Sequence, residues 1–156
     1  MVRRMARRPL MRMAVLSALL AGYWIALFAG THYPRPPRSS TGHEDKLLHL
    51  AAFAGLAVLI CLAARVRGRR RLGFYLKLLL VLAAYGAIDE RSQPWVGRTC
   101  SLGDWIADVA GAVLGVLVFA GFDAALARTR RQENSWAQGD LNVEPSVASS
   151  LAPADY

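Results

Sequence analysis

Four long apolar runs constrain this chain more than any other feature of its sequence. Runs of about 18 or more apolar residues with few charges are typical of transmembrane helices. More than half of the 156 residues are hydrophobic, and they are concentrated in four blocks, Met13–Thr31, Leu47–Ala64, Leu72–Ile88 and Leu102–Leu126. Since a helix satisfies all of its backbone groups internally, it is the simplest structure that can cross lipid. The sequence therefore predicts an all-α fold, a bundle of four transmembrane helices.

The basic residues alternate between the loops. The formal net charge of +8 would suggest a nucleic-acid partner in a soluble protein. However, 13 of the 19 Lys and Arg lie before the first run, between the second and third, or after the fourth, and five lie in the two opposite loops. This asymmetry follows the positive-inside rule and predicts that both termini are cytoplasmic. Topology thus explains the basic excess, and we expect no nucleic acid as a partner.

Composition divides the chain into three parts. We expect a basic cytoplasmic arm over residues 1–12, a membrane domain over 13–126 and a disordered cytoplasmic tail over 127–156, which is polar and has no usable period. Basic residues before an apolar run can also mark a cleaved signal peptide. The first run is longer than usual for that and ends without a small-x-small cleavage site, so we expect it to remain as an anchor.

The predicted loops contain turn and capping signals. Pro34, Pro36 and Pro37 favour an extended connection after the first span. Ser39, Ser40 or Thr41 would cap the second span, and Ser101 would cap the fourth. Cys61 and Cys100 fall at opposite ends of the predicted bundle, too far apart for a disulfide, so we expect two free thiols.

Polar side chains gather where the second, third and fourth spans reach the outer face. The stretch DERSQPWVGRTCSLGDWIAD, residues 89–108, places acids, a Gln and two Arg between two apolar runs. Asp104, Asp108, Gly111 and Gly115 follow a helical rhythm, and so do Asp45 and His49. The last two glycines form a GxxxG pattern, which is typical of close helix packing. We therefore expect the acidic stripe to face the other helices.

The ionisable residues within the predicted spans have a structural and a functional explanation. An ionisable side chain at the centre of a transmembrane helix costs about 2.5–3.5 kcal/mol on insertion scales. One reading is structural: Arg98 or Lys46 neutralises an acid such as Asp104 and fixes the helix register. Another is functional, since the acids outnumber their plausible partners. His43 or His49 with two converging carboxylates would also permit a metal ion, although no specific metal motif is present.

The order of these residues resembles the VanZ-like family of bacterial membrane proteins. The resemblance covers about residues 10–122 and is carried by Asp45–Lys46–x–x–His49, Asp89–Glu90–x–x–Gln93, Gly97–Arg98, Ser101, Asp104 and Asp108–x–x–Gly111–x–x–x–Gly115. It implies a small multi-pass protein of the bacterial cytoplasmic membrane. The family's namesake is associated with tolerance of the glycopeptide antibiotic teicoplanin. The segment between Gln93 and Arg98 is one residue shorter than usual in the family, and Asp108 stands where Asn is common.

The leading hypothesis is an envelope protein that acts on, or shields, a cell-wall or lipid-linked component at the outer leaflet. If chemistry occurs, the candidate catalytic residues are His49, Glu90 and Asp108. The candidate binding residues are Asp45, Lys46, Asp89, Gln93, Arg98, Ser101 and Asp104. Arg98 would bind an anionic group or orient a carboxylate. The alternatives are a membrane-embedded hydrolase that uses the same residues and a structural or interaction protein whose polar network sets helix register.

Overall fold

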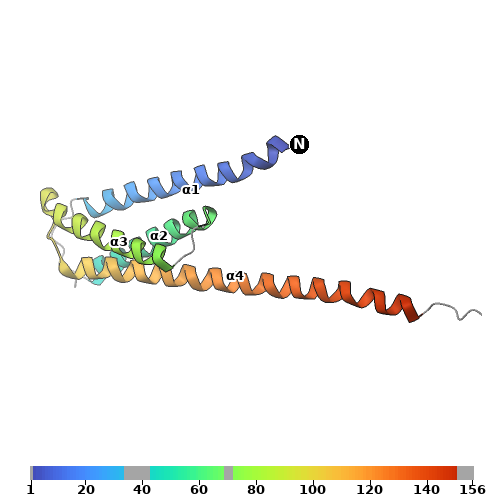
Figure 1. The fold of residues 1–156 in the computed structure, drawn as a ribbon. Coiled ribbons are helices and arrows are strands. Elements are labelled where there is room, and N and C mark those ends of the chain that lie inside the picture. Colours follow the sequence, from blue (N-terminus) through green and yellow to red (C-terminus); the bar gives the residue numbers. More distant parts are fainter. Residues whose placement is uncertain (1, 34–42, 69–71, 151–156) are drawn as a thin grey trace, which may run out of the picture. The chain divides into compact units, whose positions relative to one another are not determined.

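The helical architecture follows the apolar runs. The computed structural model describes residues 2–33, 43–68 and 72–150. Its elements are α1 (Val2–Thr31), α2 (His43–Val66), α3 (Leu72–Ser92), the 3₁₀ helix η1 (Gln93–Val96) and α4 (Leu102–Ser150) (Figure 1). The segments long and apolar enough to cross a membrane are Leu10–Thr31, Glu44–Val66, Leu72–Val96 and Leu102–Trp136. The predicted all-α fold with four membrane-capable helices is confirmed.

The helices extend past the apolar runs into polar sequence. α2 starts at His43, with Glu44 and Asp45 in its first turn, where the positive end of the helix dipole favours acids. The caps predicted at residues 39–41 and the proline-rich connection lie outside the described residues. For α4 the predicted cap is confirmed, because the Ser101 Oγ accepts a hydrogen bond of 3.3 Å from the Asp104 backbone N–H.

A tight connection joins α3 to α4. Pro94 stands at the start of η1, where its missing N–H costs nothing. Gly97 follows in the left-handed conformation with φ of 78°, and its N–H reaches the Pro94 carbonyl at 3.2 Å. The chain therefore reverses within a few residues, and the end of α3 lies beside the start of α4 (Figure 1).

The chain forms two compact units, residues 1–119 and residues 120–156. In the first unit α2 supplies the most buried apolar side chains, including Phe53, Leu56 and Ala57. The same apolar core contains Leu78 and Leu82 of α3, Ala112, Val116 and Phe119 of α4, and Leu27 of α1. The cysteines behave as predicted: both are free, Cys61 within this core and Cys100 exposed.

Small residues bring the backbones together as the GxxxG pattern predicts. A Cβ atom added to Gly111 would overlap the Leu50 carbonyl, and one added to Gly115 would overlap the Ala54 carbonyl. α4 thus lies directly against the backbone of α2 in its glycine-lined part. On another face of α2, the Tyr23 hydroxyl of α1 donates a 2.9 Å hydrogen bond to the Ala52 carbonyl.

The C-terminal part of the chain is helical where we expected disorder. We expected disorder from residue 127, but α4 continues as a helix to Ser150. Residues 124–138 contain no Gly or Pro and are rich in Ala, Arg and Gln, which favour helix even without an apolar period. Residues 151–156 lie outside the described part of the chain. The domain boundary at 126 and the cytoplasmic location of this unit stay predictions.

Candidate functional site

A group of polar side chains lies at one end of the first unit, where α1 and α3 end and α2 and α4 begin (Figure 1). We call this group the polar cluster. It consists of Thr31, His32, Asp45, His49, Asp89, Glu90, Gln93, Arg98, Ser101, Asp104 and Asp108. Seven of its members are buried: Thr31, His49, Asp89, Glu90, Gln93, Asp104 and Asp108. Because burying an unpaired polar group costs free energy, their partners determine what the cluster can do.

His49 is the central residue of the polar cluster. Its Nδ1 lies 2.9 Å from Asp108 Oδ1 and 3.8 Å from Glu90 Oε1. An ionised carboxylate only accepts hydrogen bonds, so this contact favours a proton on Nδ1 and leaves the lone pair on Nε2. Asp108 therefore orients the imidazole in the form that can accept a proton through Nε2.

Glu90 is held through both of its carboxylate oxygens. The Gln93 side-chain amide donates to Oε1 at 2.7 Å, and the Ser101 backbone N–H donates to Oε2 at 2.9 Å. The first contact is local, because Gln93 at the start of η1 follows Glu90 by three residues. The second contact is made by the residue just before α4. The carboxylate is consequently fixed beside His49 by two different segments.

Asp89 connects the polar cluster to α1. The Thr31 hydroxyl donates to Asp89 Oδ1 at 3.0 Å, and His32 Nδ1 lies 3.7 Å from the same oxygen. The other ring nitrogen of His32 lies 2.9 Å from the Ser92 hydroxyl. Thr31 and His32 are not among the predicted site residues, which all come from the second, third and fourth spans and their connections. One signal was available: His32 is one of three His in the chain and follows the first span on the predicted outer side.

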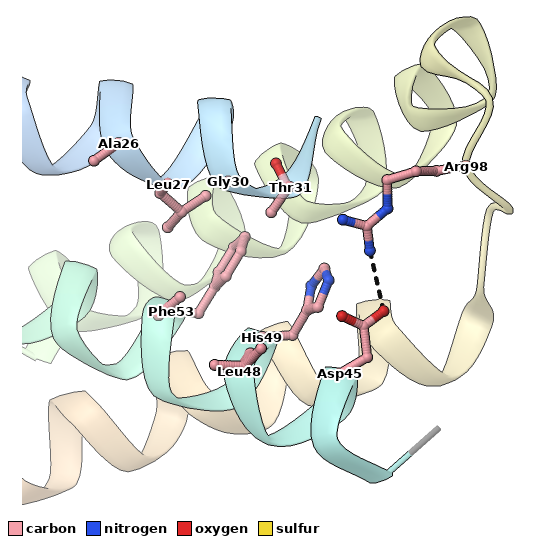
Figure 2. A pocket seen from close by; sticks show the side chains of 10 residues that line it. Ala26, Leu27, Gly30, Thr31, Asp45, Leu48, His49, Phe53 and Arg98 are labelled. Atoms are coloured by element: carbon pink, nitrogen blue, oxygen red, sulfur yellow. Dashed lines mark hydrogen bonds and ion pairs between the residues drawn. The ribbon is translucent and has the colours of Figure 1, made fainter. Parts of the chain in front are cut away.

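Arg98 reaches back from the η1–α4 connection to α2. Its Nη2 donates to Asp45 Oδ2 at 3.0 Å, and its side chain is 8% exposed. We expected Arg98 either to bind an anion or to orient a carboxylate. Asp45 is its carboxylate partner in the structure, and the role of Arg98 stays a prediction. Figure 2 shows the guanidinium above His49, beside a pocket of about 200 Å³.

Three buried atoms of the polar cluster have no hydrogen-bond partner among the described residues. They are Gln93 Oε1, Arg98 Nη1 and Asp108 Oδ2. Asp108 Oδ2 lies against Gly86, where an added Cβ atom would come within 3.0 Å of it. Buried polar atoms are rarely left unpaired, and such atoms call for an explanation such as water, an ion or a ligand.

The cluster offers two sets of ligand atoms that could hold a metal ion. One set combines His49 with Asp45 and Asp104, and the other combines it with Glu90 and Asp108; within each set the ligand atoms lie within 4.8 Å of one another. Imidazole nitrogens and carboxylate oxygens are both zinc ligands, and imidazole also suits other transition metals. His49 belongs to both sets, so one ring nitrogen cannot serve both ions.

The structure brings together nine of the ten predicted site residues. They are Asp45, His49, Asp89, Glu90, Gln93, Arg98, Ser101, Asp104 and Asp108. Lys46 differs from the other nine: it is exposed, and its side chain runs along Gly103 at the start of α4, at the edge of the group. Position explains this, because Lys46 follows Asp45 by one residue and so points about 100° away around the helix. The role of these residues in function stays a prediction.

Four apolar helices with buried ionisable groups at one end define a class, the multi-pass membrane proteins with a polar intramembrane cluster. Within that class, a family model described as VanZ/LLP1 matches residues 10–123. The match covers most of the chain and includes every residue of the polar cluster, so the chain belongs to the VanZ/LLP1 family. No curated protein and no solved structure matches the chain.

Proposed function

We propose that this protein resides in the bacterial cytoplasmic membrane with its polar cluster at the outer leaflet. There it would act on, or shield, a cell-wall or lipid-linked component. Membership of the VanZ/LLP1 family supports the membrane setting, and the arginine-rich loops support the orientation. The cell-envelope role is suggested by the resemblance to the family's namesake.

One observation carries the proposal of a working site. The polar cluster gathers five carboxyl groups around His49 but contains a single arginine, and three of its buried polar atoms lack partners in the described chain. A network that served only to hold the helices together would be expected to satisfy its own groups. The unsatisfied donors and acceptors are instead the groups that a ligand could complete.

The geometry supports the following proposed roles. Arg98 supplies the positive charge for an anionic group. Asp45 and Asp89 would position their neighbours, and Gln93, Ser101 and Asp104 would shape the rim around Glu90. If the site performs chemistry, His49 would act as the base, with Asp108 orienting it and Glu90 as the second acid–base group.

The test pairs membrane abundance with teicoplanin susceptibility in cells that express the wild type, Glu90→Gln, His49→Ala or Asp104→Asn. We expect each substitution to remove tolerance while abundance stays at the wild-type level. Glu44→Gln is the matched control, because Glu44 is an exposed acid in the first turn of α2 and outside the polar cluster. Parallel loss of abundance and tolerance would identify the cluster as structural. A wild type that confers no tolerance would separate this protein from the namesake's role.

A hydrolase is the second candidate, and the pair of His49 and Asp108 favours it. A carboxylate that orients an imidazole is a recurrent arrangement for general base catalysis. Purified full-length protein would then release phosphate from a polyprenyl diphosphate, and His49→Ala would abolish the release. Binding without release would assign the shielding role instead.

A further inference from the structure

A pocket between α1 and α2 has walls of two chemical kinds. Its volume is about 200 Å³. One part is apolar, with Ala26, Leu27, Leu48, Ala52 and Phe53, and the other carries Thr31, Asp45, His49 and Arg98 (Figure 2). Apart from Leu48, which lies between Asp45 and His49 along α2, the apolar residues lie deeper along the spans than the polar residues at the end of the bundle. Such a gradient matches a molecule that is polar at one end and apolar at the other.

The polar part contains a donor without an acceptor. Arg98 has its side chain more than nine-tenths buried, and only its Nη2 contacts Asp45. Its Nη1 is buried, lines the same space and has no partner in the described chain. A guanidinium presents five donors in a planar fork that fits phosphate and carboxylate oxygens in pairs. The unpaired donor therefore calls for an oxygen acceptor inside the pocket, and a phosphate oxygen would form the strong, charge-assisted kind of hydrogen bond with it.

On the α1 side, the pocket is lined partly by small, exposed residues. Ala26 and Gly30 line the pocket and are both exposed, and a Cβ atom added to Gly30 would meet nothing within 4 Å. In a membrane this side would face lipid, so a ligand could enter laterally. A dry cavity of about 150 Å³ already accepts benzene, so this pocket has room for a phosphate group and the first carbons of a chain.

We infer that this pocket binds the head and proximal chain of a phosphate-bearing membrane lipid, with the phosphate on Arg98 and the chain beside Phe53 and Leu27. The remainder of the chain would stay in the bilayer. This inference rests on the proposed function, since it names the ligand class of that same site.

The test uses full-length protein in detergent micelles, and native mass spectrometry measures the fraction with bound ligand. Three probes separate the sources of affinity: dimyristoyl phosphatidylglycerol, dimyristoylglycerol, which lacks the phosphate, and glycerol phosphate, which lacks the chains. We expect binding of the first at concentrations where the other two do not bind. Arg98→Gln should weaken it by about tenfold or more, since hydrogen bonds to charged groups contribute at least that factor.

Two matched pairs of variants complete the design. Gly30→Leu places a side chain into the pocket and should also weaken binding, whereas Gly22→Leu, on the same helix at another open position, should not. Arg91→Gln, which removes an exposed arginine from α3, is the control for Arg98→Gln. If Arg98→Gln does not fold, the comparison of Gly30→Leu with Gly22→Leu still tests whether the lipid binds in this pocket.

Equal binding of dimyristoylglycerol would reduce the site to nonspecific lipid contact and overturn the inference, and so would equal binding of glycerol phosphate. Unchanged binding in both Arg98→Gln and Gly30→Leu would overturn it as well. None of these results contradicts the proposed function, which is tested separately by the tolerance and abundance of the wild type and of the Glu90, His49 and Asp104 variants. The two failures can therefore be told apart.

Discussion

At the scale of single residues, the pairing of His49 with Asp108 is the contact on which the polar cluster depends most. Asp108 is fully buried, one helical turn deeper than Asp104, and only its Oδ1 has a partner, the His49 ring. Replacing Asp108 with an apolar residue leaves the buried Nδ1–H of His49 without its acceptor, which costs more than the hydrogen bond itself contributes. The stability of the protein should therefore depend on the shape of the side chain at position 108 and on its ability to accept a hydrogen bond.

We expect different outcomes for two substitutions of Asp108. Asp108→Asn keeps an acceptor oxygen at the same place, so we expect an apparent melting temperature in detergent close to that of the wild type. Asp108→Leu removes the acceptor and should cost about 1–3 kcal/mol of stability. Circular dichroism during heating measures both. An equally stable Leu variant would show that His49 finds another partner.

Residue spacing in the sequence predicts some contacts of the polar cluster and not others. The four-residue step between Asp45 and His49 indicated a shared face, and both line one pocket. The partner of Arg98 could not be predicted in this way. Asp104, Glu90 and Asp108 were equally available in the sequence, and the choice of Asp45 depends on the turn at Gly97, which sets the direction of the arginine. Contacts between elements depend on tertiary geometry that spacing does not contain.

At the scale of whole elements, the contact of α4 with α2 positions the polar cluster. Asp108 precedes Gly111 by three residues, so the close backbone contact at Gly111 and Gly115 holds the acid within reach of His49. The glycine pattern made this packing predictable from sequence. The extent of α4 was not predictable from hydrophobicity, because its residues beyond 126 are polar and helical.

The close packing of α4 on α2 predicts how glycine variants in α4 behave. Gly111→Ala forces the added methyl group against the Leu50 carbonyl, and since backbone cannot rotate away, the helices must separate. We expect a loss of about 1–3 kcal/mol, the usual cost of overpacking. Gly121→Ala meets nothing within 4 Å and should be neutral or slightly stabilising, because Ala favours helix. Thermal unfolding in detergent compares the two; equal stability would contradict the close approach of α2 and α4.

At the scale of the whole molecule, the arrangement of charge predicts which side of the membrane holds the polar cluster. Arginines before α1, between α2 and α3, and within α4 after residue 127 would be retained in the cytoplasm. The end of the bundle that carries His49 and Arg98 would then face outward. The family match and the four apolar helices define a multi-pass protein without fixing its direction.

The two native cysteines allow this orientation to be measured. Cys100 is exposed at the polar end and Cys61 is 1% exposed within the core, so a membrane-impermeant maleimide should label intact cells at Cys100 alone. Labelling should vanish in Cys100→Ser and persist in Cys61→Ser. In the Cys100→Ser background, Trp136→Cys places a thiol at an exposed position of α4, which should react only after the membrane is permeabilised. The reverse pattern, with Cys100 protected in intact cells and Trp136→Cys labelled, would place the polar cluster in the cytoplasm, where it could not act on an outer-leaflet component.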